Sequence, residues 1–302
     1  MLIRPDPLLT GAGVGIFMPA SPAREPFRSR GLQALRGMGF CPREVDDVLS
    51  GQDLFSRPPQ QTIHDLQHFF SAHDIQALWA GRGGYGSNYL LPLLDQLLIE
   101  TPKIVIASSD VSYLLWYLLE KRKMVVFYGP MAYTGMAAGA CDPVQILAAL
   151  TPNQRPLSFQ GRVLCSGRSS GSLFGGCLSN FVSLLGTRHL PVLKNRILLL
   201  EDVNERPYRL DRMLWQCEQA GVFKSLRGLL LGEFPNCFLD DQEKETFYGR
   251  WRQRLAGLGI PVLYDMPFGH ARFAQLLPLG VQAEIDTESQ SQPLCCDIGV
   301  KW

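Results

Sequence analysis

The sequence predicts an α/β protein with two domains, and three observations carry this prediction. Its 302 residues are enough for two domains, each with a core of its own. Over roughly the first 130 residues, strand-like runs alternate with helical patterns, which is typical of a largely parallel sheet. The composition changes at 151–156 (TPNQRP), which reads as a linker. We expect an N-terminal α/β domain over 1–155 with a mostly parallel sheet, and a β-rich C-terminal α/β domain over 156–302.

In the N-terminal half, each expected strand is a short apolar run and each helix an apolar stripe at helical spacing. A helix is expected to begin at Thr62, with Asp65 three residues later in an approximate capping box. The expected strands are 13–18, 75–80, 104–106 and 124–128, and the other expected helices are 25–39, 87–98 and 111–119.

The C-terminal half reads as further strands separated by polar amphipathic helices. The segment 169–172 (SSGS) is expected to be a flexible turn. The expected strands are 161–167, 197–200, 229–232 and 261–264, and the expected helices are 209–220 and 241–258.

Charge and cysteine usage exclude several classes of function. With 29 basic and 28 acidic side chains, nothing indicates a nucleic-acid or membrane-surface partner. No apolar run reaches 18 residues, so no membrane span is expected. The eight cysteines are scattered without a C-x-x-C pair, which favours free, buried thiols and a cytoplasmic location. His64 and His68 have a spacing that could hold a metal, but no third ligand is near, so we expect surface histidines and no metal site.

Ser109 lies where a buried strand turns into a helix. The run 104–106 (IVI) ends in small residues, and leucines at helical spacing begin at Leu114. A serine at such a turn is exposed near the N–H groups of a helix N-terminus, as in the nucleophile elbow of acyl-transfer enzymes. The alternative is that Ser108, Ser109 and Asp110 only cap the helix.

A glycine loop between an expected strand and helix matches G-x-G-x-x-G through Gly81, Gly83 and Gly86. Asp110 follows at a distance close to that of the ribose-binding acid of a dinucleotide fold. A nucleotide-binding domain is therefore one hypothesis. The other is that the loop supplies backbone N–H groups to an oxyanion hole.

Two further polar residues follow apolar strands, where α/β enzymes place catalytic groups. Glu201 follows 197–200 (ILLL), and His270 follows 267–269 (PFG). Together with Ser109 they would supply nucleophile, acid and base in the order Ser, Glu, His. Each has a structural alternative: His270 as a hydrogen-bonded structural residue, and Glu201 as a helix cap.

Six ordered segments resemble the LD-carboxypeptidase family, which includes murein tetrapeptide LD-carboxypeptidases and microcin C immunity peptidases. They cover most of the chain: 82–86 (RGGYG), 109–110 (SD), 129–130 (GP), 175–176 (GG), 200–202 (LED) with 208–212 (YRLDR), and 267–270 (PFGH). The resemblance implies a homodimeric serine peptidase whose active site lies at the interface of its two domains. By position, it makes Ser109 the nucleophile, Glu201 the orienting acid and His270 the base. The N–H groups of Gly84 and Asp110 would form the oxyanion hole.

The chain departs from the family pattern at four positions. Ala107 and Ser108 stand where the family usually has Gly and an aromatic residue, Cys177 where it has Asn, and Ala271 where it has Gly. Ser108 removes a ring that would line the pocket, which concerns substrate preference more than the chemistry.

The sequence thus predicts a cytoplasmic serine carboxypeptidase that releases a terminal D-amino acid, such as D-alanine from murein tetrapeptide in cell-wall recycling. It needs no cofactor and takes a small peptide as its partner. Alternatives are hydrolysis of a peptide–nucleotide antibiotic of the microcin C type, a nucleotide-binding oxidoreductase or transferase using the loop 81–86, and a non-catalytic binding protein.

Overall fold

The computed structural model describes residues 2–46, 55–152, 156–289 and 292–301 of the chain. The chain forms two compact units. The first contains Met1–Gln154, Phe273–Leu279 and Ile298–Trp302, and the second contains Arg155–Arg272 and Gly280–Asp297. The division after Gln154 lies one residue before the boundary expected from composition, and two short C-terminal segments return to the first unit.

The first unit is built on a sheet whose strand order is β12-β5-β4-β3-β1-β2. The five strands from β2 to β5 run parallel, and β12 is antiparallel to β5. The strands are β1 Gly13–Phe17, β2 Cys41–Glu44, β3 Ile75–Ala80, β4 Ile104–Ala107, β5 Val126–Tyr128 and β12 Leu277–Leu279. The order 2-1-3-4-5 is that of a doubly wound fold, in which ligands bind beyond the carboxyl ends of the strands where the order reverses.

The central strands of this sheet are apolar at nearly every position because the sheet is covered on both faces. Every residue of β4 is buried, as is every residue of β5. The helices of this unit are α1 Phe27–Gly37, α2 Pro59–Ser71, α3 Ser112–Lys121 and α4 Pro143–Leu150. The mostly parallel α/β architecture expected for this part of the chain is confirmed.

The helix expected from Thr62 is present, but its predicted start is wrong, and the helix predicted over 87–98 is absent. Helix α2 begins at Pro59, three residues before Thr62, and no side chain caps it. Proline suits the first turn because its fixed φ matches the helix and its missing N–H would have no partner there. The segment 87–98 forms two 3₁₀ turns, Ser87–Leu90 and Leu94–Gln96, rather than a helix. Pro92 lies between them and cannot donate the hydrogen bond that would continue the first turn.

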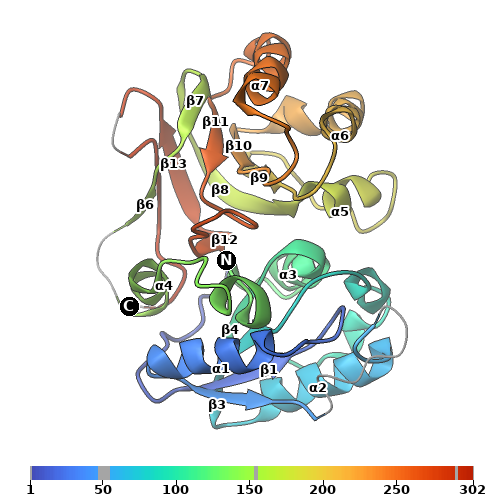
Figure 1. Ribbon diagram of the computed structural model, residues 1–302, viewed down its shortest axis with the longest axis vertical. Coiled ribbons are helices and arrows are strands. Elements are labelled where there is room, and N and C mark those ends of the chain that lie inside the picture. The colour runs from blue at the N-terminus through green and yellow to red at the C-terminus, as the bar shows by residue number, and fades with distance from the viewer. Residues whose placement is uncertain (1, 47–54, 153–155, 290–291, 302) are drawn as a thin grey trace. The chain divides into compact units, whose positions relative to one another are not determined.

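The second unit has a mixed sheet in the order β6-β14-β13-β8-β9-β10-β11-β7. Strands β8 to β11 run parallel, and the remaining pairs are antiparallel. The strands are β6 Leu157–Phe159, β7 Arg162–Cys165, β8 Arg168–Cys177, β9 Arg196–Glu201, β10 Gly228–Gly232, β11 Val262–Met266, β13 Gln282–Asp286 and β14 Leu294–Cys296. The helices α5 Leu178–Ser183, α6 Pro207–Gln219 and α7 Asp241–Ala256 connect the parallel strands and lie along that half of the sheet (Figure 1).

The expected flexible turn at 169–172 is also wrong, because these residues belong to the ten-residue strand β8. The strand is paired over 168–172 with β13 and over 172–177 with β9. Long-range pairing therefore overrides the local preference of serine and glycine for turns.

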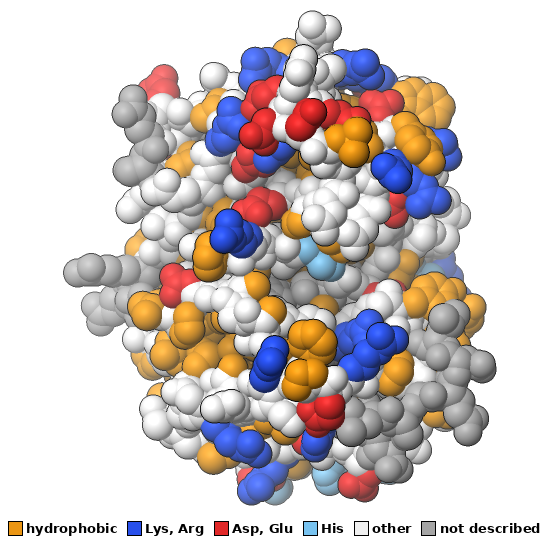
Figure 2. All heavy atoms as spheres, viewed as in Figure 1, with side chains coloured by type: hydrophobic (Ala, Val, Ile, Leu, Met, Phe, Trp, Pro, Cys, Tyr) orange, Lys and Arg blue, Asp and Glu red, His pale blue; other side chains and the backbone are white. Residues whose placement is uncertain are grey.

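Acidic and basic side chains are interspersed on the visible surface over α7 (Figure 2). Exposed ion pairs join Arg162 to Glu245 and Arg254 to Glu218 in this region. Such a surface has no strong field of one sign, in agreement with the balanced composition. Among the described residues, no helix is long and apolar enough to cross a membrane. The cysteines are all free, and although several are buried, Cys41 is exposed.

Candidate active site

Ser109 has a strained backbone at the carboxyl end of β4. Its φ is +56°, in the left-handed region, where a residue other than glycine costs about 1–3 kcal/mol. The preceding Ser108 is extended and only 4% exposed, whereas Ser109 is half-buried. The 3₁₀ turn Ser109–Val111 then leads into α3. The turn therefore buries the first serine and leaves the second accessible.

A tyrosine and a glycine hold this turn from two sides. The N–H of Ser109 donates to Tyr128 Oη at 3.1 Å, so it is satisfied outside the helix. A Cβ on Gly83 would lie 3.1 Å from Ser109 Cβ and 3.2 Å from its Oγ. The glycine loop is thus in close contact with the serine side chain.

The glycine loop follows β3 and contacts the loop that follows β1, at the point where the strand order of the sheet reverses. Ser21, after β1, donates its N–H to the Gly83 carbonyl at 3.2 Å, and its Oγ accepts the Tyr85 N–H at 3.3 Å. Gly84 has φ +112°, and a Cβ there would lie 2.2 Å from Ser21 Oγ. Only glycine fits at this position.

The Asp110 carboxylate is buried and accepts hydrogen bonds from the same loop. Its Oδ2 accepts the Ser87 N–H at 2.8 Å, and the Ser87 hydroxyl donates to the Asp110 carbonyl. Burial raises the pKa of Asp110, while hydrogen bonds from Ser87 and from the Gly86 backbone oppose that rise. The carboxylate binds protein backbone, which is not the role of the ribose-binding acid in a dinucleotide fold.

In the second unit, the structure brings together the predicted acid and base. Glu201 ends β9 and is fully buried. His270 Nδ1 lies 2.8 Å from Glu201 Oε2, and the His270 N–H donates to the same oxygen at 3.2 Å. With Nδ1–H donated to the carboxylate, Nε2 carries the lone pair that can accept a proton.

The net direction of the His270 pKa shift is upward. Burial alone would lower the pKa of His270, but the charge of Glu201, the hydrogen bond to it and the charge of Asp202 outweigh burial. A histidine oriented by a buried carboxylate is the arrangement of a general base.

Two glycines make room for the Glu201 carboxylate. Gly269 has φ +69°, and a Cβ there would lie 2.2 Å from Glu201 Cδ. A Cβ on Gly232, in the neighbouring strand β10, would lie 2.6 Å from Glu201 Cβ. The glycine before His270 is therefore required for the contact between acid and base.

Asp202 has a structural role that the sequence did not reveal. Its Oδ2 accepts the Ser179 N–H at 2.9 Å, and its Oδ1 accepts the Val203 N–H at 2.9 Å. Cys177 Sγ lies 3.7 Å from the same carboxylate. Burial and the neighbouring Glu201 raise the pKa of Asp202 to about 6. Only the pairing of β8 with β9, far apart in sequence, brings these groups together.

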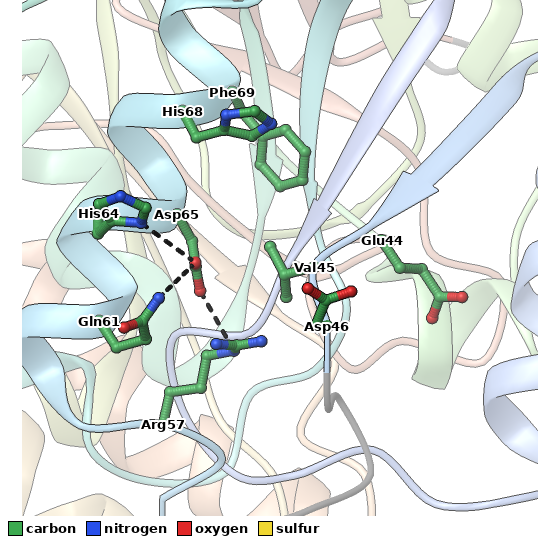
Figure 3. Close-up of a pocket in the computed structure, with 9 residues that line it drawn as sticks. All are labelled: Glu44, Val45, Asp46, Arg57, Gln61, His64, Asp65, His68 and Phe69. Atoms are coloured by element: carbon green, nitrogen blue, oxygen red, sulfur yellow. Dashed lines mark hydrogen bonds and ion pairs between the residues drawn. The ribbon is translucent and has the colours of Figure 1, made fainter.

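A pocket of about 400 Å³ in the first unit contains the two histidines at metal-like spacing (Figure 3). Asp65 follows His64 on α2. Its carboxylate forms an ion pair with Arg57 at 3.2 Å and accepts a hydrogen bond from the Gln61 side-chain amide at 3.1 Å. Within the described ranges, no three histidine, cysteine or acidic side chains form a metal-binding group.

Comparison with known proteins assigns the family. Residues 14–129 match the LD-carboxypeptidase N-terminal domain, and residues 170–285 match the LD-carboxypeptidase C-terminal domain. The murein tetrapeptide carboxypeptidase of Pseudomonas aeruginosa is 31% identical over 75% of this chain and 78% of its own. The chain belongs to the LD-carboxypeptidase family. The resemblance read from the sequence is confirmed.

Two further similar proteins extend over nearly the whole chain. The microcin C7 self-immunity protein MccF of Escherichia coli is 26% identical over 94% of this chain and 93% of its own. A structure of MccF in complex with aspartyl sulfamoyl adenosine matches the fold with a TM-score of 0.87, covering 99% of this chain and 100% of that one. A muramoyltetrapeptide carboxypeptidase from Oxalobacter formigenes matches with a TM-score of 0.82 and 27% identity, covering 95% and 99%.

The structure thus places the predicted site residues of this family member in two groups. Gly84, Ser109 and Asp110 belong to the first unit, in the loops after β3 and β4. Glu201 and His270 belong to the second unit and are in direct contact.

Proposed function

We propose that this protein is a serine LD-carboxypeptidase that hydrolyses the bond between an L-centre and a terminal D-amino acid. The observation that carries the proposal is the 2.8 Å contact between His270 Nδ1 and the buried Glu201 carboxylate. A serine hydroxyl is a weak nucleophile and needs such an oriented base. Ser109, accessible at its strained turn, is the nucleophile of the proposal.

In the proposed mechanism, His270 Nε2 accepts the Ser109 hydroxyl proton as Oγ attacks the scissile carbonyl carbon. The carbonyl oxygen becomes an oxyanion, which the N–H groups of Gly84 and Asp110 stabilise by hydrogen bonding. The imidazolium, stabilised by Glu201, then protonates the leaving amine, and the D-amino acid departs. A water molecule, deprotonated by His270, hydrolyses the acyl-enzyme and regenerates Ser109. The reaction needs neither a metal nor a cofactor.

The proposed substrate is a cytoplasmic murein tetrapeptide, from which the enzyme releases D-alanine during cell-wall recycling. The similarity to proteins named murein tetrapeptide and muramoyltetrapeptide carboxypeptidase supports this choice. The proposal includes a homodimer that acts in the cytoplasm. It assigns the nucleophile to the first unit and the acid and base to the second, so that catalysis requires both.

Hydrolysis of a peptide–nucleotide antibiotic is the second candidate. The similarity to MccF over almost the full length of both chains favours it. The nucleotide-binding oxidoreductase is disfavoured, since the Asp110 carboxylate that would bind a ribose accepts backbone hydrogen bonds from Ser87 instead.

A direct comparison of substrates tests the proposal. Purified protein is incubated with the tetrapeptide L-Ala-γ-D-Glu-meso-diaminopimelate-D-Ala and, separately, with aspartyl sulfamoyl adenosine. We expect release of D-alanine from the tetrapeptide and none with the Ser109→Ala variant. Turnover of the sulfamoyl adenosine alone would favour the second candidate, and turnover of neither compound would contradict both.

A further inference from the structure

The glycine loop and the serine turn are connected through one buried side chain. The Asp110 carboxylate is 5% exposed, and its Oδ2 accepts the Ser87 N–H at 2.8 Å. The Ser87 hydroxyl donates a second hydrogen bond, to the backbone carbonyl of Asp110. Ser87 is itself fully buried, so water does not compete for these hydrogen bonds.

The glycine loop needs a hydrogen-bond partner that fixes its conformation, because its glycines can adopt many backbone conformations. Gly84 has φ +112° and Gly86 has φ +125°, values that glycine reaches easily and also leaves easily. A hydrogen bond from a backbone N–H to a carboxylate is about twice as strong as a neutral one. The buried carboxylate therefore restricts the end of a loop that would otherwise sample several conformations.

Gly84 lies only two residues before Gly86 and carries one of the two N–H groups proposed for the oxyanion hole. The other N–H belongs to Asp110 itself. An oxyanion hole stabilises the transition state only if both donors are held in place before the charge develops. Asp110 thus contributes to the proposed oxyanion hole in two ways: its N–H is one donor, and its carboxylate holds the loop that carries the other donor, the Gly84 N–H.

We propose that the Asp110 carboxylate is a positioning group that fixes the glycine loop to the serine turn and thereby aligns Gly84 and Asp110 as oxyanion donors. This inference rests on the proposed serine peptidase function. It assigns to the carboxylate a role separate from that of the Asp110 N–H. The carboxylate touches neither substrate nor nucleophile in this role.

Three variants test the inference. Asp110→Ala removes both acceptor oxygens, Asp110→Asn retains one, and Ser87→Ala removes the hydroxyl but retains the N–H. All three leave the Asp110 backbone N–H present. The control is Asp65→Asn, because Asp65 is also a buried carboxylate of this unit but pairs with Arg57 and Gln61. Thermal denaturation identifies any variant that is not folded at the assay temperature.

Kinetics with the murein tetrapeptide provide the first readout. We expect Asp110→Ala to lower kcat by about 10²-fold, Asp110→Asn by about 10-fold and Ser87→Ala by about 3-fold, with KM nearly unchanged, because oxyanion donors act in the transition state. The Asp65→Asn control should retain its kcat. If Asp110→Ala is not folded, Asp110→Asn decides the outcome.

Amide hydrogen exchange provides a second readout that does not depend on activity. The Ser87 N–H should exchange faster in the Asp110 variants than in the wild type and the Asp65→Asn control. An active wild type together with unchanged kcat or unchanged exchange in Asp110→Asn would overturn this inference alone. A wild type inactive on both candidate substrates would overturn the proposed function and this inference with it.

Discussion

The two groups of candidate site residues are held in place by different physical means. In the first unit, the geometry around Ser109 comes mainly from backbone groups: a left-handed residue, glycines with positive φ, and N–H groups that donate to Tyr128 and to the Asp110 carboxylate. In the second unit it comes from a buried charge, since Glu201 has no exposed surface and contacts His270 directly. We infer that added Cβ atoms in the glycine loop disturb the first group, and that the second group responds to pH through the protonation of His270.

The largest expected effect distinguishes the two adjacent serines of the first group. Ser109→Ala should lower kcat by about 10⁴-fold or more, whereas Ser108→Ala should lower it by less than about 10-fold. The structural reason is that Ser108 is buried and Ser109 is accessible. Steady-state kinetics on folded variants measure both values. Reversed magnitudes would place the nucleophile on Ser108.

The pH dependence of kcat/KM tests the roles of His270 and Glu201. His270 must be neutral to act as a base, so kcat/KM should rise with pH through an apparent pKa above 6.5, the direction set by Glu201. Glu201→Gln should lower kcat by roughly 10³-fold and move that midpoint downward. A pH-rate profile of wild type and variant measures both effects. A midpoint that is the same in both proteins would contradict the role of Glu201.

The stabilising effect of the pair formed by His270 and Glu201 should fall with rising pH, whereas kcat/KM should rise. Because the folded-state pKa of His270 is raised, its contribution to the free energy of unfolding is complete below about pH 6.5 and is lost as pH rises through the folded value. The excess Tm of wild type over Glu201→Gln should therefore be larger at pH 5.5 than at pH 8. Asp202, whose pKa is raised to about 6 by burial and by Glu201, titrates in the same range. The Asp202→Asn variant is the control that assigns the effect to His270.

Smaller effects should separate two neighbouring glycines of the loop. Gly84→Ala places a Cβ 2.2 Å from Ser21 Oγ at a φ of +112°, and we expect kcat to fall by about 10²-fold. Gly83→Ala brings its Cβ to 3.1 Å from Ser109 Cβ, which a shift of a few tenths of an ångström relieves, so about 10-fold is expected. An equal fall in kcat in the two variants would contradict the conclusion that the backbone conformation of Gly84 aligns the first group.

Removal of metal ions should have the smallest effect. The described residues hold no group of three metal-binding side chains, and Asp65 between the two histidines is already paired with Arg57. Dialysis against a chelator should leave the wild-type kcat unchanged. A loss of activity that added zinc restores would contradict a metal-independent mechanism.

The sequence could predict those parts of the fold and site that local patterns determine. The strand before Ser109 is a β-branched run, and the strand before Glu201 is a run of aliphatic residues, so their carboxyl ends could be located. Strand β8 could not be predicted, because Ser169 and Ser170 are extended only through pairing with residues more than 100 positions later.

Two hydrogen bonds of the site could not be predicted from the sequence either. Asp110 and Ser87 are 23 residues apart, and so are Asp202 and Ser179. Each contact exists because parallel strands bring distant loops to one edge of a sheet, and the residues themselves carry no spacing that indicates it. The left-handed φ of Ser109 is likewise a consequence of the surrounding contacts rather than of serine's own preference.

The most direct test of the central claim is the location of a covalent adduct. The wild-type protein and the Ser108→Ala, Ser109→Ala and His270→Ala variants are treated with a fluorophosphonate, and the modified peptide is mapped by tandem mass spectrometry. The account predicts one adduct on Ser109 in the wild type and in Ser108→Ala, none in Ser109→Ala, and slow labelling in His270→Ala. An adduct on Ser108, or equal labelling rates in the wild type and His270→Ala, would contradict it.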